Sequence, residues 1–202
     1  WKHKTFELVW NKSPLVQKIC KKISGLTESM VQKIPHTSTN QEFVRQAIKY
    51  HFPTLKVAHG PFAGMGYPKA EAVGSTIFPK LLGSYESEIA ADVQKALRDM
   101  PDVIIDVGCA EGYYAVGAAI LCPQAKIFAF DLDMEAQALC RAMAEHNNVA
   151  DRLVVGGKCA TPQPLLSIPL ERKGLFFCDC EGYEKKLLTK AIFEHFRAFT
   201  FI

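Results

Sequence analysis

The sequence lacks any uninterrupted apolar run close to the ~20 residues that a transmembrane helix requires. It also lacks a secretory signal at its start, internal repeats and low-complexity tracts. These absences predict a cytoplasmic protein without a membrane partner. The first residue is Trp1 rather than Met, so we expect a fragment or a chain whose natural start is missing.

Metal-binding cysteine pairs are absent as well. The seven cysteines show no CxxC spacing, on which the common zinc sites depend. Cys178 and Cys180 lie two positions apart on an expected strand, so they share one face and are not expected to form a disulfide. An odd number of unpaired cysteines favours a reducing compartment.

Net charge is small over the whole chain but uneven along it. The 202 residues carry a net charge of +3. Residues 1–50 hold nine Lys and Arg against three acids, a net of +6, which leaves −3 for the remainder. A basic segment can serve nucleic acid or a membrane surface, but these lysines are scattered among Val, Ile and Leu, which favours a solvated helical surface.

The first 83 residues are expected to form an N-terminal extension, with helices in residues 1–35. Thr39 and Glu42 form a capping-box pattern that opens a further helix, which Pro53 ends. Residues 54–82 are rich in Gly and Pro and predict short strands and turns, or a loop over a site. Ser84 is then expected to cap a helix that runs to about Arg98, and to begin the main domain, residues 84–202.

From Pro101 onward, short apolar runs alternate with helical patterns. This alternation favours an α/β fold with a mostly parallel sheet and helices on both faces. The expected strands are residues 103–107, 126–131, 152–155, 175–179 and 196–202, and the expected helices are residues 112–121, 133–146 and 183–193.

The loop after the first of these strands carries the strongest functional pattern, Asp106–Gly112. Gly108 and Gly112 remove a Cβ where the backbone must turn and approach a ligand. The helix that begins near Gly112 offers free N–H groups to the carboxylate of a methionine moiety, and Asp106 can accept a hydrogen bond from its amino group. The pattern is neither the GxGxxG of dinucleotide-binding loops nor a P-loop, while an ordinary strand-to-helix turn stays open.

An acid at the end of the second strand strengthens the reading of this loop as a nucleoside site. Asp131 can accept hydrogen bonds from the two hydroxyls of a ribose, and Leu132 offers an apolar face to adenine. Asp133 is better placed to cap the following helix.

The loop Asp106–Gly112 and the strand-end Asp131 resemble the first two motifs of class I S-adenosylmethionine-dependent methyltransferases, which have a Rossmann-like fold. The run Asp179–Glu184 is similar to the D-x-E-G-x-E pattern of the FkbM-like family. The resemblance implies S-adenosylmethionine as cofactor, with Cys109 and Ala110 among its contacts. A class I domain normally continues into two further strands, so we expect C-terminal strands to be missing beyond Ile202.

The predicted activity is methyl transfer from S-adenosylmethionine to an oxygen of a small-molecule or sugar-like acceptor. Asp179 and Glu181 are the candidate catalytic residues, because they follow the fourth strand at the edge where ligands bind in such sheets. The pair Asp179-Cys180 replaces the Asp-Asn pair of metal-assisted enzymes, so no metal is expected. Methylation of RNA or protein, a non-catalytic cofactor-binding domain and, more distantly, a nucleotide-dependent oxidoreductase stay open; nucleic acid is disfavoured as a partner, and the sequence does not indicate an oligomeric state.

Overall fold

The computed structural model describes residues 40–169 and 173–202. The chain divides into two compact units between Val44 and Arg45, and the second unit, Arg45–Ile202, contains the sheet and the candidate site. The helices expected within residues 1–35, and Thr39 of the capping box, lie outside the described residues. The helix that this box was expected to open is α3, Asn40–His51.

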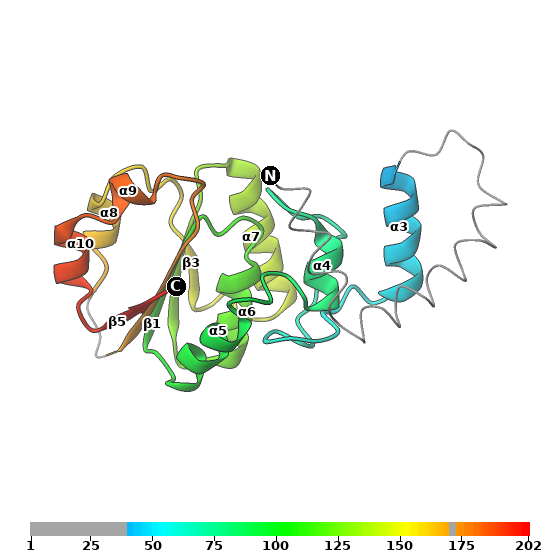
Figure 1. Cartoon of the computed structure of the whole chain (residues 1–202), viewed down its shortest axis with the longest axis horizontal. Coiled ribbons are helices and arrows are strands. Elements are labelled where there is room, and N and C mark those ends of the chain that lie inside the picture. Colours follow the sequence, from blue (N-terminus) through cyan, green and yellow to red (C-terminus); the bar gives the residue numbers. More distant parts are fainter. Residues whose placement is uncertain (1–39, 170–172) are drawn as a thin grey trace. The chain divides into compact units, whose positions relative to one another are not determined.

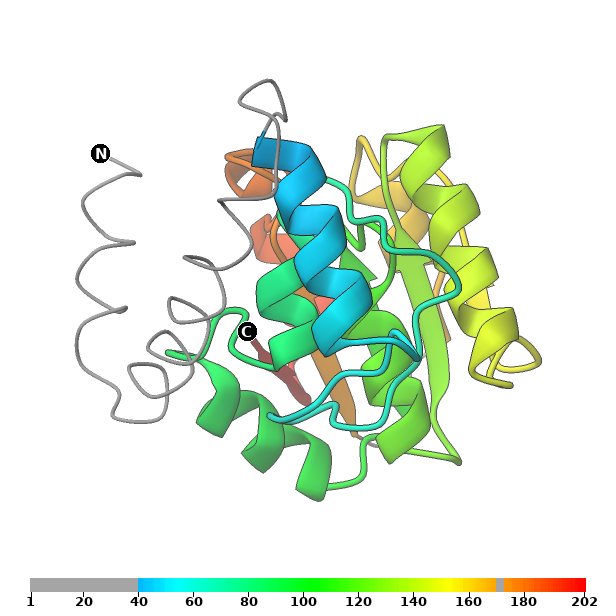
Figure 2. The same cartoon turned by 90° about the vertical axis from the view of Figure 1, so that its right-hand side faces the viewer.

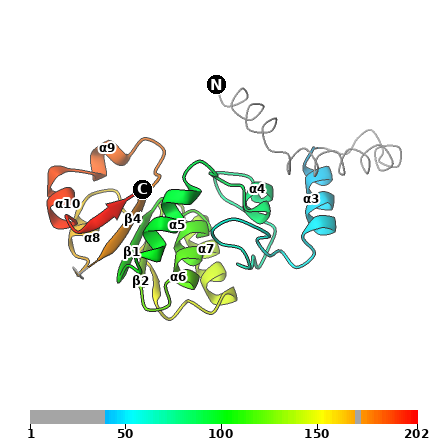
Figure 3. The ribbon, with the colours of Figure 1, turned by 60° about the horizontal axis from the view of Figure 1, so that its bottom comes forward.

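Five parallel strands form a single sheet in the order β3-β2-β1-β4-β5. The strands are β1 (Val103–Val107), β2 (Lys126–Phe130), β3 (Leu153–Val155), β4 (Gly174–Cys178) and β5 (Phe199–Phe201). Figure 3 shows β2, β1 and β4 side by side. The order reverses between β1 and β4, which makes their carboxyl ends the switch point where ligands bind in Rossmann-like sheets. The expected parallel α/β fold is confirmed.

Helices cover both faces of this sheet (Figure 1). One layer consists of α5 (Ala90–Arg98), α6 (Tyr113–Leu121) and α7 (Met134–His146, yellow-green in Figure 2), and the other of α8 (Gln163–Leu166), α9 (Glu184–Leu187) and α10 (Lys190–His195). Every residue of β1 is buried, because both of its faces are covered. Among the described residues, no helix is long and apolar enough to cross a membrane.

Two helix predictions are wrong in detail, and two helices were not predicted. Ser84 does not cap a helix, because it follows Gly83 at the end of an unpredicted helix, α4 (Ile77–Leu82), and α5 begins only at Ala90. The single helix expected over residues 183–193 is two short helices, since Thr189 is extended between them. The helix α8 was not predicted either. By contrast, Asp133 caps α7 as expected, accepting a hydrogen bond from the Glu135 N–H.

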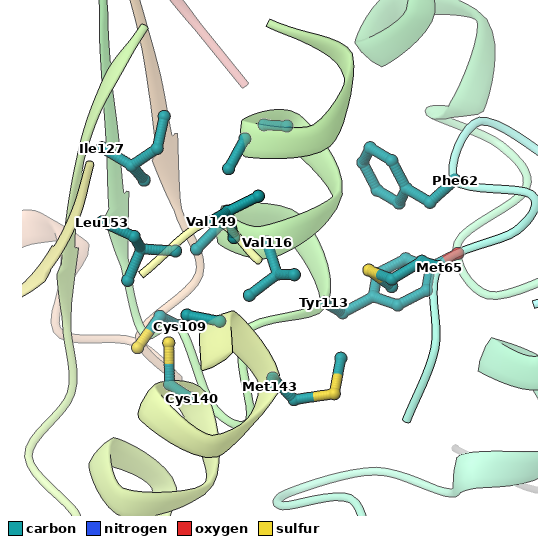
Figure 4. Close-up of a cluster of buried hydrophobic side chains, with 14 of the residues drawn as sticks. Phe62, Met65, Cys109, Tyr113, Val116, Ile127, Cys140, Met143, Val149 and Leu153 are labelled. Carbon is teal, nitrogen blue, oxygen red and sulfur yellow. The ribbon is translucent and has the colours of Figure 1, made fainter. Parts of the chain in front are cut away.

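Residues 54–76 form turns with one isolated antiparallel bridge, Lys56 to Gly66. Phe62 and Met65 pack against the α6–α7 layer, near Tyr113 (Figure 4). The Asn147 side chain also holds this segment in place. It accepts a hydrogen bond from Gly66 N at 2.9 Å and donates one to Gly66 O at 2.8 Å. Residues 45–83, expected in the N-terminal extension, belong to the compact unit Arg45–Ile202.

Candidate functional site

The loop between β1 and α6 lies at the switch point of the sheet. Gly108 and Gly112 have φ values of +87° and +96°, a conformation that L side chains rarely adopt. The N–H groups of Gly108 and Cys109 both donate to Phe130 O at the end of β2. Ala110 also lies in the left-handed region, at φ +48°, although it carries a Cβ. The loop is therefore tightly constrained, as the glycine spacing predicted.

Asp106 is the single acidic residue of β1, and its side chain is buried against this loop. The residue is 3% exposed, and its Oδ2 atom has no hydrogen-bond partner among the described residues. Burial raises the Asp106 pKa to about 7; the Ala115 N–H lowers it, nearby Asp131 and Asp179 raise it, and Lys80 lowers it. A buried acceptor without a donor is costly, so this position fits a ligand that supplies a donor.

Asp131 joins the loop to the end of β2. Its Oδ2 accepts from the Ala110 N–H at 2.9 Å and its Oδ1 from the Asp133 N–H at 2.9 Å. Each carboxylate oxygen has two lone pairs, so both can accept one further hydrogen bond. The carboxylate can therefore shape the loop and still bind a pair of hydroxyls.

Two adjoining cavities lie around the loop, with volumes of about 260 Å³ and 400 Å³. They share Lys80, Tyr85, Gly108, Ala110 and Asp179. The first cavity extends toward Phe130, Asp131, Leu132, Cys159, Glu181 and Tyr183. The second extends toward Glu86, Asp106, Cys109, Tyr113, Tyr114 and Phe177.

The structure brings most of the predicted site residues together around these cavities. Gly108 and Ala110 line both, Asp131 and Leu132 the first, and Asp106 and Cys109 the second. Asp179 lines both cavities, and Glu181 lines the first, at a φ of +54°. Gly112 lines neither of the two; its absent Cβ leaves room for Cys140 Sγ, which such an atom would approach to 2.9 Å.

Glu184 shapes the loop that carries these two acids. Its Oε1 accepts from the Cys180 N–H at 2.9 Å and from the Gly182 N–H at 3.2 Å. The backbone N–H of Glu184 itself and then those of Cys180 and Gly182 lower the Glu184 pKa. From the sequence, Glu184 is expected on the surface of a helix. The short separation of Cys180, Gly182 and Glu184 is nevertheless compatible with a turn.

Cys178 and Cys180 lie on either side of Asp179, with their sulfur atoms 3.8 Å apart. Both are free thiols, as are the other described cysteines, Cys109, Cys122, Cys140 and Cys159. Burial raises the pKa of both Cys178 and Cys180, so both remain protonated at neutral pH. Among the residues that the structure describes, no group of three or more His, Cys, Asp or Glu side chains could hold a metal ion.

A buried ion pair links this loop to α4, and no pattern in the sequence predicts it. Lys80 Nζ lies 2.6 Å from Glu111 Oε1, and both residues are almost completely buried. Tyr67 donates to the same oxygen at 3.2 Å, and the Val73 N–H donates to Oε2 at 3.1 Å. No local spacing pattern connects Lys80 to Glu111, since 31 positions separate them.

An aromatic group forms part of the second cavity's wall. The rings of Tyr114 and Phe177 stack with centroids 5.0 Å apart, and Tyr85 packs edge-on to Tyr113. The Tyr114 hydroxyl donates to Glu86, while the buried Tyr113 hydroxyl has no partner among the described residues. Burial raises the Tyr113 pKa to about 12, so this hydroxyl remains a potential donor.

Curated proteins similar to this chain are methyltransferases. A ribosomal protein L11 methyltransferase of Acinetobacter baylyi is 37% identical over 93 residues, which are 44% of this chain and 30% of that protein. A probable cobalt-precorrin-6B C(15)-methyltransferase (decarboxylating) of Pyrobaculum calidifontis is 36% identical over 94 residues, 46% of each chain. The chain thus spans less than half the length of these two relatives.

Two solved methyltransferase structures match part of this chain. An O-methyltransferase of Bacillus cereus in complex with SAH has a TM-score of 0.44 at 16% identity, covering 57% of this chain and 52% of that one. A precorrin-6y C5,15-methyltransferase of Geobacter metallireducens has a TM-score of 0.44 at 20% identity, covering 56% and 57%. No protein-family model matches the sequence, so the FkbM-like resemblance stays a prediction.

Proposed function

We propose that this chain is an S-adenosylmethionine-dependent methyltransferase of class I. The observation that carries the proposal is the unpartnered, buried Oδ2 of Asp106 beside the constrained loop Gly108–Gly112. An amino group that donates to this oxygen would satisfy it and stabilise its charge. The names of the similar curated proteins support the same activity.

The two cavities together suit the parts of this cofactor. Asp131 would accept from the ribose hydroxyls, and Leu132, which is half exposed beside it, would contact the adenine. The methionine portion would extend past Gly108 into the second cavity, where Asp106 and Cys109 lie. Ala110 would contact the ligand from the loop, because it lines both cavities.

When bound, S-adenosylmethionine supplies a methyl group on a positively charged sulfur, and its transfer needs mainly correct positioning of the acceptor. Asp179 is exposed and lines both cavities, so it can orient an acceptor where they meet. If the acceptor is a hydroxyl, Asp179 or Glu181 would accept its proton as the new bond forms. We propose such an oxygen on a small-molecule or sugar-like acceptor.

A protein acceptor is the second candidate. The observation in its favour is the similarity to ribosomal protein L11 methyltransferases, which is confined to less than half of either chain. Methyl transfer to a protein in an extract, with none to small hydroxyl compounds, would favour a protein acceptor over a small-molecule oxygen acceptor.

The free state of all six described cysteines also supports a reducing, cytoplasmic setting.

Calorimetric titration with S-adenosylhomocysteine tests the proposed cofactor. We expect one site per chain for this ligand and no binding of NAD. A folded sample that binds NAD but not S-adenosylhomocysteine would refute the proposal. Asp131→Ala should weaken binding by about 1–3 kcal/mol, the cost of leaving polar partners unpaired. Asp151→Ala, at an exposed acid away from the cavities, is the matched control.

A further inference from the structure

Lys80 is a lysine in an unusual place. It belongs to the short helix α4, is 2% exposed, and lines both cavities. Its ammonium also lies over the Tyr85 ring, 4.7 Å from the centroid. Burying a charged lysine costs several kcal/mol unless its partners compensate. Its position beside a ligand-sized space therefore calls for a reason beyond packing.

Glu111 explains only part of this arrangement. This carboxylate already accepts from Tyr67 and from the Val73 backbone in addition to Lys80. Glu111 lies behind Lys80 and, among the described residues, lines neither of the two cavities. The ammonium has three N–H groups, of which Glu111 Oε1 takes one. Lys80 thus contacts a carboxylate that has other donors and also lines the ligand space.

A residue of the opposite charge also lines the second cavity. Asp106 lines the second cavity with an oxygen that lacks a donor, and Lys80 is near enough to influence its ionisation. An unpaired acid and a buried cation along one cavity match the two charges of an α-amino acid. A phosphate would fit poorly, because Glu86, Asp106 and Asp179 in the same walls would repel its two negative charges.

We propose that Lys80 binds the carboxylate of the cofactor's amino-acid tail, while Asp106 binds its ammonium group. This inference rests on the proposed function and adds a residue to it from outside the glycine loop. The glycine loop alone favours the start of α6 as the site of this carboxylate. However, the Ala115 N–H in the first turn of that helix already faces Asp106 closely enough to lower its pKa. Lys80 supplies a full positive charge instead.

The test compares two ligands that differ only at the tail. S-adenosylhomocysteine has both the amino group and the carboxylate, and its decarboxylated analogue keeps the amino group alone. In calorimetric titrations, the unaltered chain should bind S-adenosylhomocysteine about ten- to a hundredfold more tightly than the analogue, as expected for a charge-assisted contact. Lys80→Met should abolish this preference and leave the analogue's affinity unchanged.

Lys80→Met strands the buried Glu111, which can prevent folding. The double variant Lys80→Met with Glu111→Gln removes both charges and provides the decisive measurement, with circular dichroism to check its fold. Lys95→Met, at an exposed lysine of α5, is the control and should keep the full preference.

Loss of the preference in the folded double variant supports the assignment. A preference that persists in that variant overturns it, as does an unaltered chain that binds both ligands equally, and either result leaves the proposed function intact. An unaltered chain that binds neither ligand overturns both the assignment and the proposed function.

Discussion

Gly108 and Asp179 meet backbone to backbone where the loops after β1 and β4 converge. A Cβ built on Gly108 would overlap the carbonyl oxygen of Asp179 and approach the Cα of Cys180 to 3.4 Å. The loop expected to bind the cofactor and the loop expected to face the acceptor therefore have a fixed separation. Any side chain at position 108 must push them apart.

Gly108→Ala should consequently impair both stability and ligand binding. The strained φ of +87° costs about 1–2 kcal/mol for an L residue, and the clash with a neighbouring backbone adds to it. Urea denaturation and titration with S-adenosylhomocysteine measure the two effects. Gly157→Ala is the matched control, because Gly157 has a similar φ of +78° but its nearest atom would be 3.9 Å from a Cβ. Equal losses in the two variants would contradict the proposed close approach.

Asp106→Asn should stabilise the ligand-free chain above pH 7 while abolishing tight binding of the cofactor. The Asp106 pKa rises from 3.8 to about 7 on folding, so the folded chain binds the extra proton between these values. Stability therefore falls as pH rises from 4 to 7, by up to about 4 kcal/mol, and Asn removes this loss. Denaturation at pH 5 and pH 8 measures it, with Asp99→Asn at an exposed position as control. A variant that is less stable than the parent at pH 8 would count against the buried charge.

Binding of S-adenosylhomocysteine should release a proton near pH 6. An ammonium group beside Asp106 favours the ionised carboxylate, whose pKa is about 7 without ligand. The affinity should accordingly fall by up to about tenfold per pH unit below 7. Calorimetry in two buffers of different ionisation enthalpy counts the released protons. An affinity that is constant from pH 5 to pH 8 would show that Asp106 does not contact the amino group.

Glu184→Ala should loosen the loop that carries Asp179 and Glu181. The substitution leaves the Cys180 and Gly182 N–H groups without their acceptor, which should lower the free energy of unfolding. We expect a larger fall in methyl-transfer rate than in cofactor affinity, because the loop faces the acceptor side. Glu194→Ala removes an exposed acid of α10 that pairs with Lys190 and should change neither quantity. Comparable rates in the two variants would argue against a positioning role.

The sequence predicted those features that depend on local order. The conformations of the apolar run at β1 and of the glycines that follow it depend on residues only a few positions away. The same is true of the Asp133 cap. Lys80 and Glu111 come together only because α4 folds against the loop, and no periodicity reports such a contact. The helix predicted from Ser84 failed because Glu86 adopts a φ of +46°, which propensity alone does not reveal.

For a related reason, the sequence does not predict that Asp106 Oδ2 and the Tyr113 hydroxyl are buried without hydrogen-bond partners. Whether a polar atom is satisfied depends on every neighbour that packs around it, and those neighbours come from several elements. Residue types indicate which groups can donate or accept, whereas burial decides which of them need a ligand.

The hydrogen bonds that Glu111 accepts from Tyr67, Val73 and Lys80 affect the local stability of the segment that donates them. All three partners lie within residues 67–80, so local opening of this segment would strip the cofactor loop of its supports. A ligand that needs the intact loop must then oppose that opening. At a concentration one hundred times its Kd, it would make the opened state about 2.7 kcal/mol less accessible. Residues 67–80 thereby acquire resistance to amide exchange from a molecule held mainly by other parts of the fold.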